Sequence, residues 1–282
     1  MSPRSYLYVP ADQDDKVAKA PGSGADALIL DLEDSVPPDR KAAARENAAA
    51  AIPALSGPAG VEVWARINAD TPEADVAAVA VPGLAGIVVP KAEPPLLALA
   101  DLLLTRAEEA HGLRSGTFAV LALIESAVGV AQAERVAAAP RVTRLGVGEA
   151  DLAGELGLRP GPAREELWPI RSRIVVASAV AGILPPVGPV ETAVRDLELL
   201  ESGTRTLLRQ GFRARTALSP RQSPVINEVF TPSAEETEEA GDLVRRLAEG
   251  VTLDARGRFI DPAVVRSAHE VLARAANAAP RP

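Results

Sequence analysis

The chain has 282 residues and a formal net charge of −8, with 47% hydrophobic, 24% charged and 3% aromatic residues. This length fits one large α/β barrel or two ordinary domains, and the composition is that of a globular protein. The acidic balance argues against nucleic acid as a general partner, because phosphate binding needs a basic face. The sequence contains no cysteine, which excludes disulfides, thiolate metal sites and cysteine nucleophiles.

Apolar runs are short throughout the sequence. The amino-terminal segment has no signal-peptide-like apolar stretch, and no run reaches the length of a membrane span. We therefore expect a cytoplasmic protein without membrane association. His111 and His269 lie in helix-like stretches with no second ligand at metal-binding spacing, so we expect solvated surface positions for both.

Short runs of aliphatic residues alternate with longer Ala-rich amphipathic stretches, which is the spacing of βα units and predicts a parallel sheet. Eight strands with seven or eight helices over roughly 230 residues predict a TIM barrel. A doubly wound open sheet is the alternative, but no Gly-rich dinucleotide motif follows the first strand. The predicted strands are Tyr6–Val9, Ala27–Asp31, Val61–Ile67, Gly86–Val89, Phe118–Ile124, Arg144–Val147, Val187–Val190 and Arg215–Leu218. The predicted helices are Asp12–Ala20, Asp39–Ala51, Pro72–Val79, Pro94–Ala110, Val128–Ala138, Ala163–Ala181 and Val194–Arg209.

The pattern changes after the last predicted strand. We assign residues 1–230 to the barrel and residues 231–282 to a carboxyl-terminal helical extension. Ser233 and Glu236 form a capping-box pattern at the start of a helix over residues 232–250. A short extended pair around residues 250–260 follows, and then a helix begins at Asp261 and Pro262. The extension is predicted to act as a lid or as an arm on a neighbouring subunit.

Charged residues follow five consecutive predicted strands. Barrel enzymes carry their chemistry at the carboxyl ends of the strands. One such residue is commonly a helix cap or a solvated loop charge, but charge at the same end of five strands favours a functional site. These residues are Asp31, Glu33 and Asp34, then Arg66 with Asn68, Lys91, Glu125, and finally Glu149 with Asp151.

The residue types fit one kind of chemistry. Glu125 and Asp151 follow adjacent strands and could bind one cation, and ligation by oxygen alone suits Mg²⁺. Arg66 offers a planar fork for the carboxylate of a 2-oxo acid, whose carbonyl the cation would polarise. The alternative is a buried ion-pair network of these carboxylates with Arg66 and Lys91.

The chain also resembles a known family. Its motifs, in order from Arg4 to about Val265, resemble the citrate lyase beta-subunit-like group of the HpcH/HpaI aldolase superfamily, which includes malyl-CoA and citramalyl-CoA lyases. The matching segments are "RSYLYVPA", "GADALILDLEDSV", "RIN", "VVPKAE", "LIESAVGV", "GVGEADLAGELG", "GF" with "SPRQSPVINEVFTPS", and "DARGRFIDPAVV". The resemblance implies a TIM barrel, Mg²⁺ as cofactor and a homo-oligomer, a trimer or hexamer.

Transferred by position, the resemblance implies a role for each matching residue. Arg66 would hold the oxo-acid carboxylate, Glu33 and Asp34 would orient Arg66 and hold waters on the cation, and Asp261 would be the acid/base acting in a neighbouring subunit. The metal ligands would be Glu125 and Asp151, and further substrate-binding residues Lys91 and Arg4.

Three departures from the family pattern fall on the first and last strands. Ala11 replaces a glycine, Ala214–Arg215 replaces Gly-Lys, and Ser219 replaces the histidine of an Ile-His-Pro motif. A serine cannot provide the two-sided hydrogen bonding of an imidazole. In the family this region lies near the entrance for the thioester, so we expect the thioester-side wall of the site to be altered.

The expected function is that of a Mg²⁺-dependent lyase. It would cleave a 3-hydroxyacyl-CoA such as malyl-, methylmalyl- or citramalyl-CoA to an acyl-CoA and glyoxylate or pyruvate, or run the reverse condensation. Hydrolysis of the thioester after condensation is a variant. The alternatives are an aldolase on a free hydroxy-oxo acid and a citrate-lyase-like subunit acting on a carrier-protein thioester.

Overall fold

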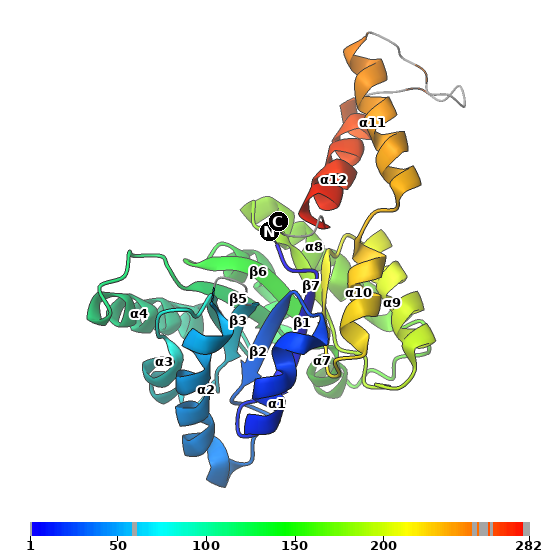
Figure 1. The fold of residues 1–282 in the computed structure, drawn as a ribbon. Coiled ribbons are helices and arrows are strands. Elements are labelled where there is room, and N and C mark those ends of the chain that lie inside the picture. Colours follow the sequence, from blue (N-terminus) through cyan, green and yellow to red (C-terminus); the bar gives the residue numbers. More distant parts are fainter. Residues whose placement is uncertain (1, 58–60, 250–252, 254–258, 260–261, 279–282) are drawn as a thin grey trace. The chain divides into compact units, whose positions relative to one another are not determined.

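The computed structural model of the chain describes residues 2–57, 61–249, 253, 259 and 262–278. The strands close into a barrel in which every neighbouring pair is parallel, including the first with the last (Figure 1). This confirms the predicted TIM barrel. The strands are β1 Ser5–Pro10, β2 Ala27–Asp31, β3 Glu62–Arg66, β4 Gly86–Val89, β5 Ala119–Ile124, β6 Val142–Val147, β7 Leu184–Gly188 and β8 Ala214–Ala217.

Helices follow the strands in the order typical of βα units. They are α1 Asp14–Lys19, α2 Lys41–Leu55, α3 Pro72–Val79, α4 Pro94–Ala110, α5 Ala127–Ala131, α6 Ala133–Ala137, α7 Glu149–Leu156, α8 Trp168–Ala181, α9 Leu197–Arg209, α10 Gln222–Phe230, α11 Ala234–Ala248 and α12 Pro262–Ala278. Short 3₁₀ turns lie at Ala20–Ser23, Pro38–Arg40 and Glu165–Leu167. In the described part of the chain no helix is long and apolar enough to cross a bilayer.

The predicted helices Pro72–Val79 and Pro94–Ala110 are confirmed at both ends. A proline occupies the first turn of each, where its fixed φ suits the helix and its missing N–H costs no hydrogen bond. The single helix predicted over Val128–Ala138 is wrong, because Gln132 separates α5 from α6. Helix α7 was not predicted; it ends at Gly157, whose left-handed φ of 65° terminates it.

Strand β7 begins three residues earlier than predicted. Its sequence is LPPVG, and its two consecutive prolines have no N–H to donate to the ladder. The structure pairs β7 with β6 and β8 at only a few positions. Side chains bind its carbonyl groups instead: Arg144 donates to Pro185 O at 2.6 Å and Thr216 to Gly188 O at 3.1 Å.

The barrel interior is apolar and aromatic at its amino end. Tyr6 and Trp64 meet edge to face, with ring centroids 6.2 Å apart, among Ile29, Val88 and Leu121. The guanidinium of Arg144 lies buried beside this cluster. It donates to Pro3 O at 2.8 Å and to the Tyr6 hydroxyl at 3.2 Å, in addition to Pro185 O. This arginine therefore fills the amino end of the barrel and links β1, β6 and β7.

The chain divides into one compact unit of residues 3–226 and a second of residues 1–2 with 227–282. In the second unit α11 and α12 pack against each other. Both hydrogen bonds of the predicted capping box are present, Glu236 N to Ser233 Oγ at 3.0 Å and Ser233 N to Glu236 Oε2 at 2.8 Å. An isolated antiparallel bridge joins Leu253 to Phe259, within the predicted extended pair.

We predict that Arg144→Met lowers the free energy of unfolding by about 3 kcal/mol, because the carbonyls of Pro3 and Pro185 lose charged donors inside the barrel. Urea unfolding measures the loss. Arg205→Met, which removes an exposed ion pair with Glu201 on α9, should cost about 0.5 kcal/mol or less. Equal losses in the two variants would contradict a structural role for the buried arginine.

Candidate functional site

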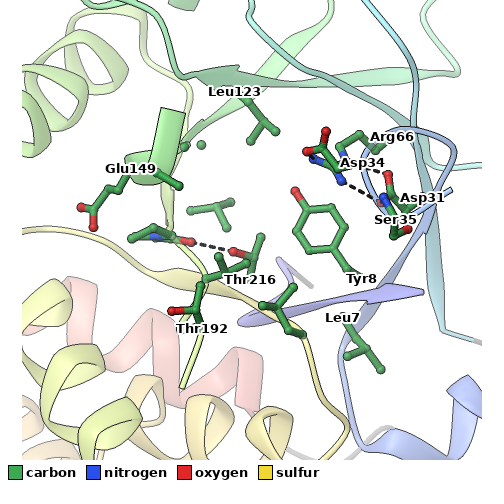
Figure 2. Close-up of a pocket in the computed structure, with 18 of the residues that line it drawn as sticks. Leu7, Tyr8, Asp31, Asp34, Ser35, Arg66, Leu123, Glu149, Thr192 and Thr216 are labelled. Carbon is green, nitrogen blue, oxygen red and sulfur yellow. Dashed lines mark hydrogen bonds and ion pairs between the residues drawn. The ribbon is translucent and has the colours of Figure 1, made fainter. Parts of the chain in front are cut away.

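A cavity of about 1090 Å³ opens at the carboxyl ends of the strands. Six of its lining residues were predicted from the sequence as strand-end charges. They are Asp31, Asp34, Arg66, Glu125, Glu149 and Asp151. Figure 2 shows Arg66, Asp31, Asp34 and Ser35 gathered on one side, with the ring of Tyr8 pointing into the space before them.

The Asp31 carboxylate holds Arg66 by two hydrogen bonds. The strand register places Asp31 opposite Arg66, and the distances are 2.6 Å from Nε to Oδ1 and 2.7 Å from Nη2 to Oδ2. The same carboxylate accepts the backbone N–H groups of Glu33 and Ser35 at 3.0 and 3.1 Å. Burial would raise the pKa of Asp31, but the hydrogen bonds from Arg66 and Ser35 outweigh it and hold this pKa below its usual value.

Arg66 also contacts Glu33 and Asp34, through its other terminal nitrogen. Nη1 lies 2.9 Å from Glu33 Oε2 and 3.1 Å from Asp34 Oδ2. The Asp34 side chain is 75% exposed, whereas that of Glu33 is 14% exposed. The guanidinium carbon lies 4.8 Å above the Tyr8 ring, which supports it from below. The edge of Arg66 that faces Asp34 is thus the one a ligand can reach.

Burial raises the pKa of Glu33 to about 7. The Arg66 charge acts in the opposite direction, and the neighbouring carboxylates Asp34 and Glu125 add to the increase. Near neutral pH this side chain is therefore able to hold or release a proton at the wall of the site.

Glu125 is buried and positioned by the backbone. Its Oε1 accepts the Lys91 N–H at 2.7 Å, and Lys91 adopts a left-handed φ of 45°. A Cβ at Gly148 would lie 2.4 Å from Glu125 Oε2, so glycine is needed there to leave room for the carboxylate. Burial raises the pKa of Glu125 to about 7, and the charge of Asp151 contributes. Asp151 lies in the first turn of α7 and lines the same cavity.

The two carboxylates fit a hard divalent cation. Within the described residues, neither Glu125 nor Asp151 has a lysine or arginine at salt-bridge distance, which weakens the alternative of an ion-pair network. No group of three or more His, Cys, Asp or Glu residues poised to hold a metal is found in the described ranges. Two protein carboxylates with remaining positions for water or substrate is the pattern that Mg²⁺ favours.

Some residues predicted at the site do not reach the cavity. The Lys91 side chain is exposed and does not line it, so Lys91 meets the site through its backbone amide. Arg4 precedes β1 and binds Asp26, with Nε 2.8 Å from Oδ2, at the opposite end of the barrel. This geometry gives no support to substrate binding by either side chain. Asp261 lies outside the described residues.

The contacts that Asp31 and Tyr8 make with Arg66 were not predicted from the sequence. Asp31 was noted only as one of several strand-end charges. Aligning the ends of β2 and β3 would have placed it opposite Arg66. Tyr8 gave no comparable signal, because an aromatic residue within a buried strand is normally core.

A buried network of arginines and glutamates forms another wall of the cavity. Arg164 binds Glu149 and Glu191, with N–O distances of 3.1 and 3.2 Å. Arg171 binds Glu149 at 2.5 Å, and Arg215 lies 3.5 Å from Glu191. Arg164 and Glu149 line the cavity, and so do Lys16 and Lys19 of α1. Basic side chains other than Arg66 therefore line the cavity as well.

At the last strand, where the sequence departs from the family pattern, the structure shows local hydrogen bonds around Arg215 and Ser219. The buried guanidinium of Arg215 donates to Pro189 O at 2.9 Å and to Thr204 Oγ1 at 2.8 Å. Gln222 accepts the backbone N–H groups of Leu218 and Ser219 at 2.8 and 3.2 Å. The loop after β8 is thus ordered, and Ser219 lines the cavity there.

A closed (β/α)₈ barrel with charged side chains gathered in a cavity at the carboxyl ends of its strands has the architecture of a TIM-barrel enzyme. The profile of the HpcH/HpaI aldolase/citrate lyase family matches residues 4–220, and the chain belongs to this family.

Individual relatives are similar over nearly the whole chain. An L-malyl-CoA/beta-methylmalyl-CoA lyase of Cereibacter sphaeroides is 34% identical, with 97% of this chain and 94% of the relative covered. The citrate lyase subunit beta of Leuconostoc mesenteroides subsp. cremoris is 30% identical, with 95% and 92% covered. A crystal structure of CitE from Mycobacterium tuberculosis in complex with magnesium, acetoacetate and coenzyme A has a TM-score of 0.78 and 28% identity, and the match covers 97% of this chain and 98% of CitE.

We predict that Glu33 destabilises the metal-free protein as the pH rises. Its pKa is higher in the folded state than the ordinary value of 4.5, so the folded state binds more protons between about pH 4.5 and 7, and stability falls across that window. Glu33→Gln should therefore stabilise the protein more at pH 8 than at pH 5, as measured by urea unfolding in EDTA. Glu198→Gln, at an exposed position of α9, serves as the control. A benefit of Glu33→Gln that is the same at both pH values would show that burial does not raise this pKa.

Proposed function

We propose that the protein is a Mg²⁺-dependent carbon–carbon lyase that cleaves a 3-hydroxyacyl-CoA to an acyl-CoA and a 2-oxo acid, or catalyses the reverse condensation. The observation that carries the proposal is the convergence of Arg66, Glu125 and Asp151 on one cavity. Membership of an aldolase and lyase family, and relatives named malyl-CoA lyase, support the reaction class. Malyl-, methylmalyl- and citramalyl-CoA are the substrates we favour.

Arg66 would bind the carboxylate of the oxo acid. Its Nε edge is occupied by Asp31, so Nη1 would turn from Asp34 to the substrate. Asp34 is exposed and can leave without a desolvation penalty, whereas Asp31 and Tyr8 keep the guanidinium plane fixed. Glu33 would then remain beside the bound carboxylate as a group able to exchange a proton near neutral pH.

Glu125 and Asp151 would hold the Mg²⁺, which when bound supplies a Lewis acid for the oxygen at the reacting carbon. A cation at this position would also favour the ionised form of Glu125, whose pKa burial raises in its absence.

Cleavage breaks the bond between C2 and C3 of the hydroxyacyl chain. The hydroxyl group loses a proton and becomes the carbonyl of the oxo acid, while the bonding electrons pass to the thioester side, which takes up a proton at carbon. We propose Asp261 as the acid that delivers this proton, acting in a neighbouring subunit of a homotrimer or hexamer. The extension of residues 231–282 would then pack on that neighbour. We also propose a cytoplasmic location, the compartment where free acyl-CoA substrates would be met.

The cavity has room and charge for a large acyl carrier. Its volume of about 1090 Å³ far exceeds a two- or three-carbon acid, and Lys16, Lys19 and Arg164 can meet phosphate groups. The CitE structure that binds coenzyme A is similar over the whole chain. We propose that the thioester group enters over the wall formed by α1 and the β8 loop.

A second candidate is an aldolase that acts on a free hydroxy-oxo acid. The altered loop after β8 favours it, because Ser219, which replaces the histidine of the family motif, lines the cavity where the thioester is expected. Action on a carrier-protein thioester, as the citrate lyase beta relative suggests, is the remaining alternative.

Mass-spectrometric cleavage assays with and without Mg²⁺ test these candidates. The panel holds malyl-, methylmalyl- and citramalyl-CoA beside free 4-hydroxy-2-oxo acids. Mg²⁺-dependent release of acetyl-CoA or propionyl-CoA supports the thioester lyase. Turnover of the free acids alone supports the second candidate, and inactivity on both together with co-purification of an acyl carrier protein supports the third.

We predict that Glu125→Gln and Asp151→Asn each reduce Mg²⁺-dependent turnover by about 10²-fold or more, because each removes a charged ligand. Isothermal titration with Mg²⁺ should show correspondingly weaker binding, and circular dichroism should show an intact barrel. Glu155→Gln, one turn further along α7, is the matched control. Full activity in both Glu125→Gln and Asp151→Asn would refute the assignment of these two residues as metal ligands.

We predict that Asp261→Asn reduces cleavage but leaves binding of Mg²⁺ and oxo acid unchanged, because it acts only on the acyl side. Turnover and titration calorimetry separate the two effects. Mixing Asp261→Asn with Glu125→Gln subunits should restore part of the activity if Asp261 acts in its neighbour. Mixed oligomers without any recovered activity would argue against a shared active site.

A further inference from the structure

Lys41 lies behind the loop that carries Glu33 and Asp34, and the proposed reaction gives it no role. It is the first residue of α2. Its ammonium group donates to Leu32 O at 2.6 Å, to Glu33 O at 2.7 Å and to Asn68 Oδ1 at 2.7 Å. All three N–H groups of the side chain are therefore used. Within the described part of the chain, no carboxylate lies at salt-bridge distance from this ammonium group.

One peptide group links Lys41 to the hydrogen-bonded pair of Asp31 and Arg66. The carbonyl of the Leu32–Glu33 peptide accepts from Lys41, and the N–H of the same peptide donates to Asp31 Oδ1 at 3.0 Å. Asp31 in turn binds both Nε and Nη2 of Arg66. A cation on one side and an anion on the other thus fix the plane of this peptide, and the orientation of the Asp31 carboxylate depends on it.

The partner Asn68 is itself held rigidly. Its side-chain NH₂ donates to Leu32 O at 2.9 Å and to Asp75 Oδ2 at 2.7 Å. Asp75 is buried and pairs with Arg45, with Nε 2.6 Å from Oδ1. The oxygens around Lys41 are therefore in place before any ligand arrives.

The geometry requires lysine. The chain uses arginine at most of its basic positions and lysine at only four. An ammonium group directs three N–H bonds tetrahedrally at three oxygens, whereas the planar guanidinium of arginine is longer and directs its donors in one plane. Arginine at position 41 would keep the charge but lose this arrangement.

We propose that Lys41 is a positioning residue, which orients Arg66 and Glu33 for the oxo acid by holding the Leu32–Glu33 peptide. The effect on turnover rests on the proposed function, but the effect on the loop does not. Because the chain has no cysteine, Lys41→Cys creates a single thiol. Alkylation with 2-bromoethylamine rebuilds a side chain of lysine's length and charge, whereas 2-iodoethanol gives a neutral one of similar size.

The first readout is amide hydrogen exchange of residues 32–35 in the ligand-free protein. We expect exchange at least tenfold faster in Lys41→Cys and in its hydroxyethyl form, and wild-type exchange after aminoethylation. Arg205→Cys, exposed on α9 and treated identically, controls for the reagents. Wild-type exchange in the neutral form overturns the proposal. If Lys41→Cys does not fold, Lys41→Arg tests the same point: faster exchange supports the proposal, and unchanged exchange overturns it.

The second readout is the split between kcat and KM. Loss of a residue that orients a binding group from behind typically reduces activity by about 10–100-fold. We expect this reduction in kcat/KM for Lys41→Cys and for its hydroxyethyl form. Only aminoethylation should restore kcat/KM. Normal kcat/KM in the neutral form overturns the role in turnover. A wild-type protein inactive on every substrate would refute the proposed function, while hydrogen exchange would still decide the role of Lys41 in the loop.

Discussion

The paired hydrogen bonds between Asp31 and Arg66 join the architecture of the barrel to its chemistry. They form because β2 and β3 are paired in a register that places these residues opposite each other. A shift of one residue would turn the side chains of one strand to the other face and separate the two groups. The Asp31 carboxylate also accepts N–H groups from Glu33 and Ser35, so the loop after β2 is built on the same interaction.

The mouth of the barrel is electrostatically divided. Near Arg66, burial raises the pKa values of Glu33 and Glu125 to about 7, and neighbouring carboxylates add to the increase, so that ionisation is costly here. On the opposite side of the cavity from Arg66 (Figure 2), Glu149 pairs with Arg164, and Lys16 also lines the cavity. A substrate with a small carboxylate at one end and phosphates at the other would match this division, and a divalent cation would relieve the repulsion on the acidic side.

Much of this arrangement could be predicted from the sequence because it follows from local signals. Charges placed directly after aliphatic runs located Arg66, Glu125 and Asp151, and prolines in first turns gave the limits of α3 and α4. Contacts between residues that are distant in the sequence were harder to predict. The support of Arg66 by Tyr8, and the use of the Lys91 amide rather than its ammonium group, depend on backbone geometry that residue type does not reveal.

Two other expectations show where sequence patterns mislead. Arg4 belongs to a motif of the family, yet a residue that precedes a strand lies at the amino end of a parallel barrel, away from the cavity. The start of β7 was predicted three residues too late, because two prolines lie in its first half and arginine and threonine side chains bind carbonyl groups of the strand. Local propensity could not anticipate partners that arrive from β6 and β8.

Strand β7 is held in the barrel in a different way from β2 and β3. On the β2–β3 side, the reaction centre depends on a strict strand register. Along β7, few backbone positions pair with β6 and β8, and the side chains of Arg144 and Thr216 bind carbonyl groups of the strand. Substitutions near β7 and β8 can therefore alter that wall of the cavity without changing the pairing of Asp31 with Arg66. Such a division would allow one scaffold to acquire new substrates through few mutations.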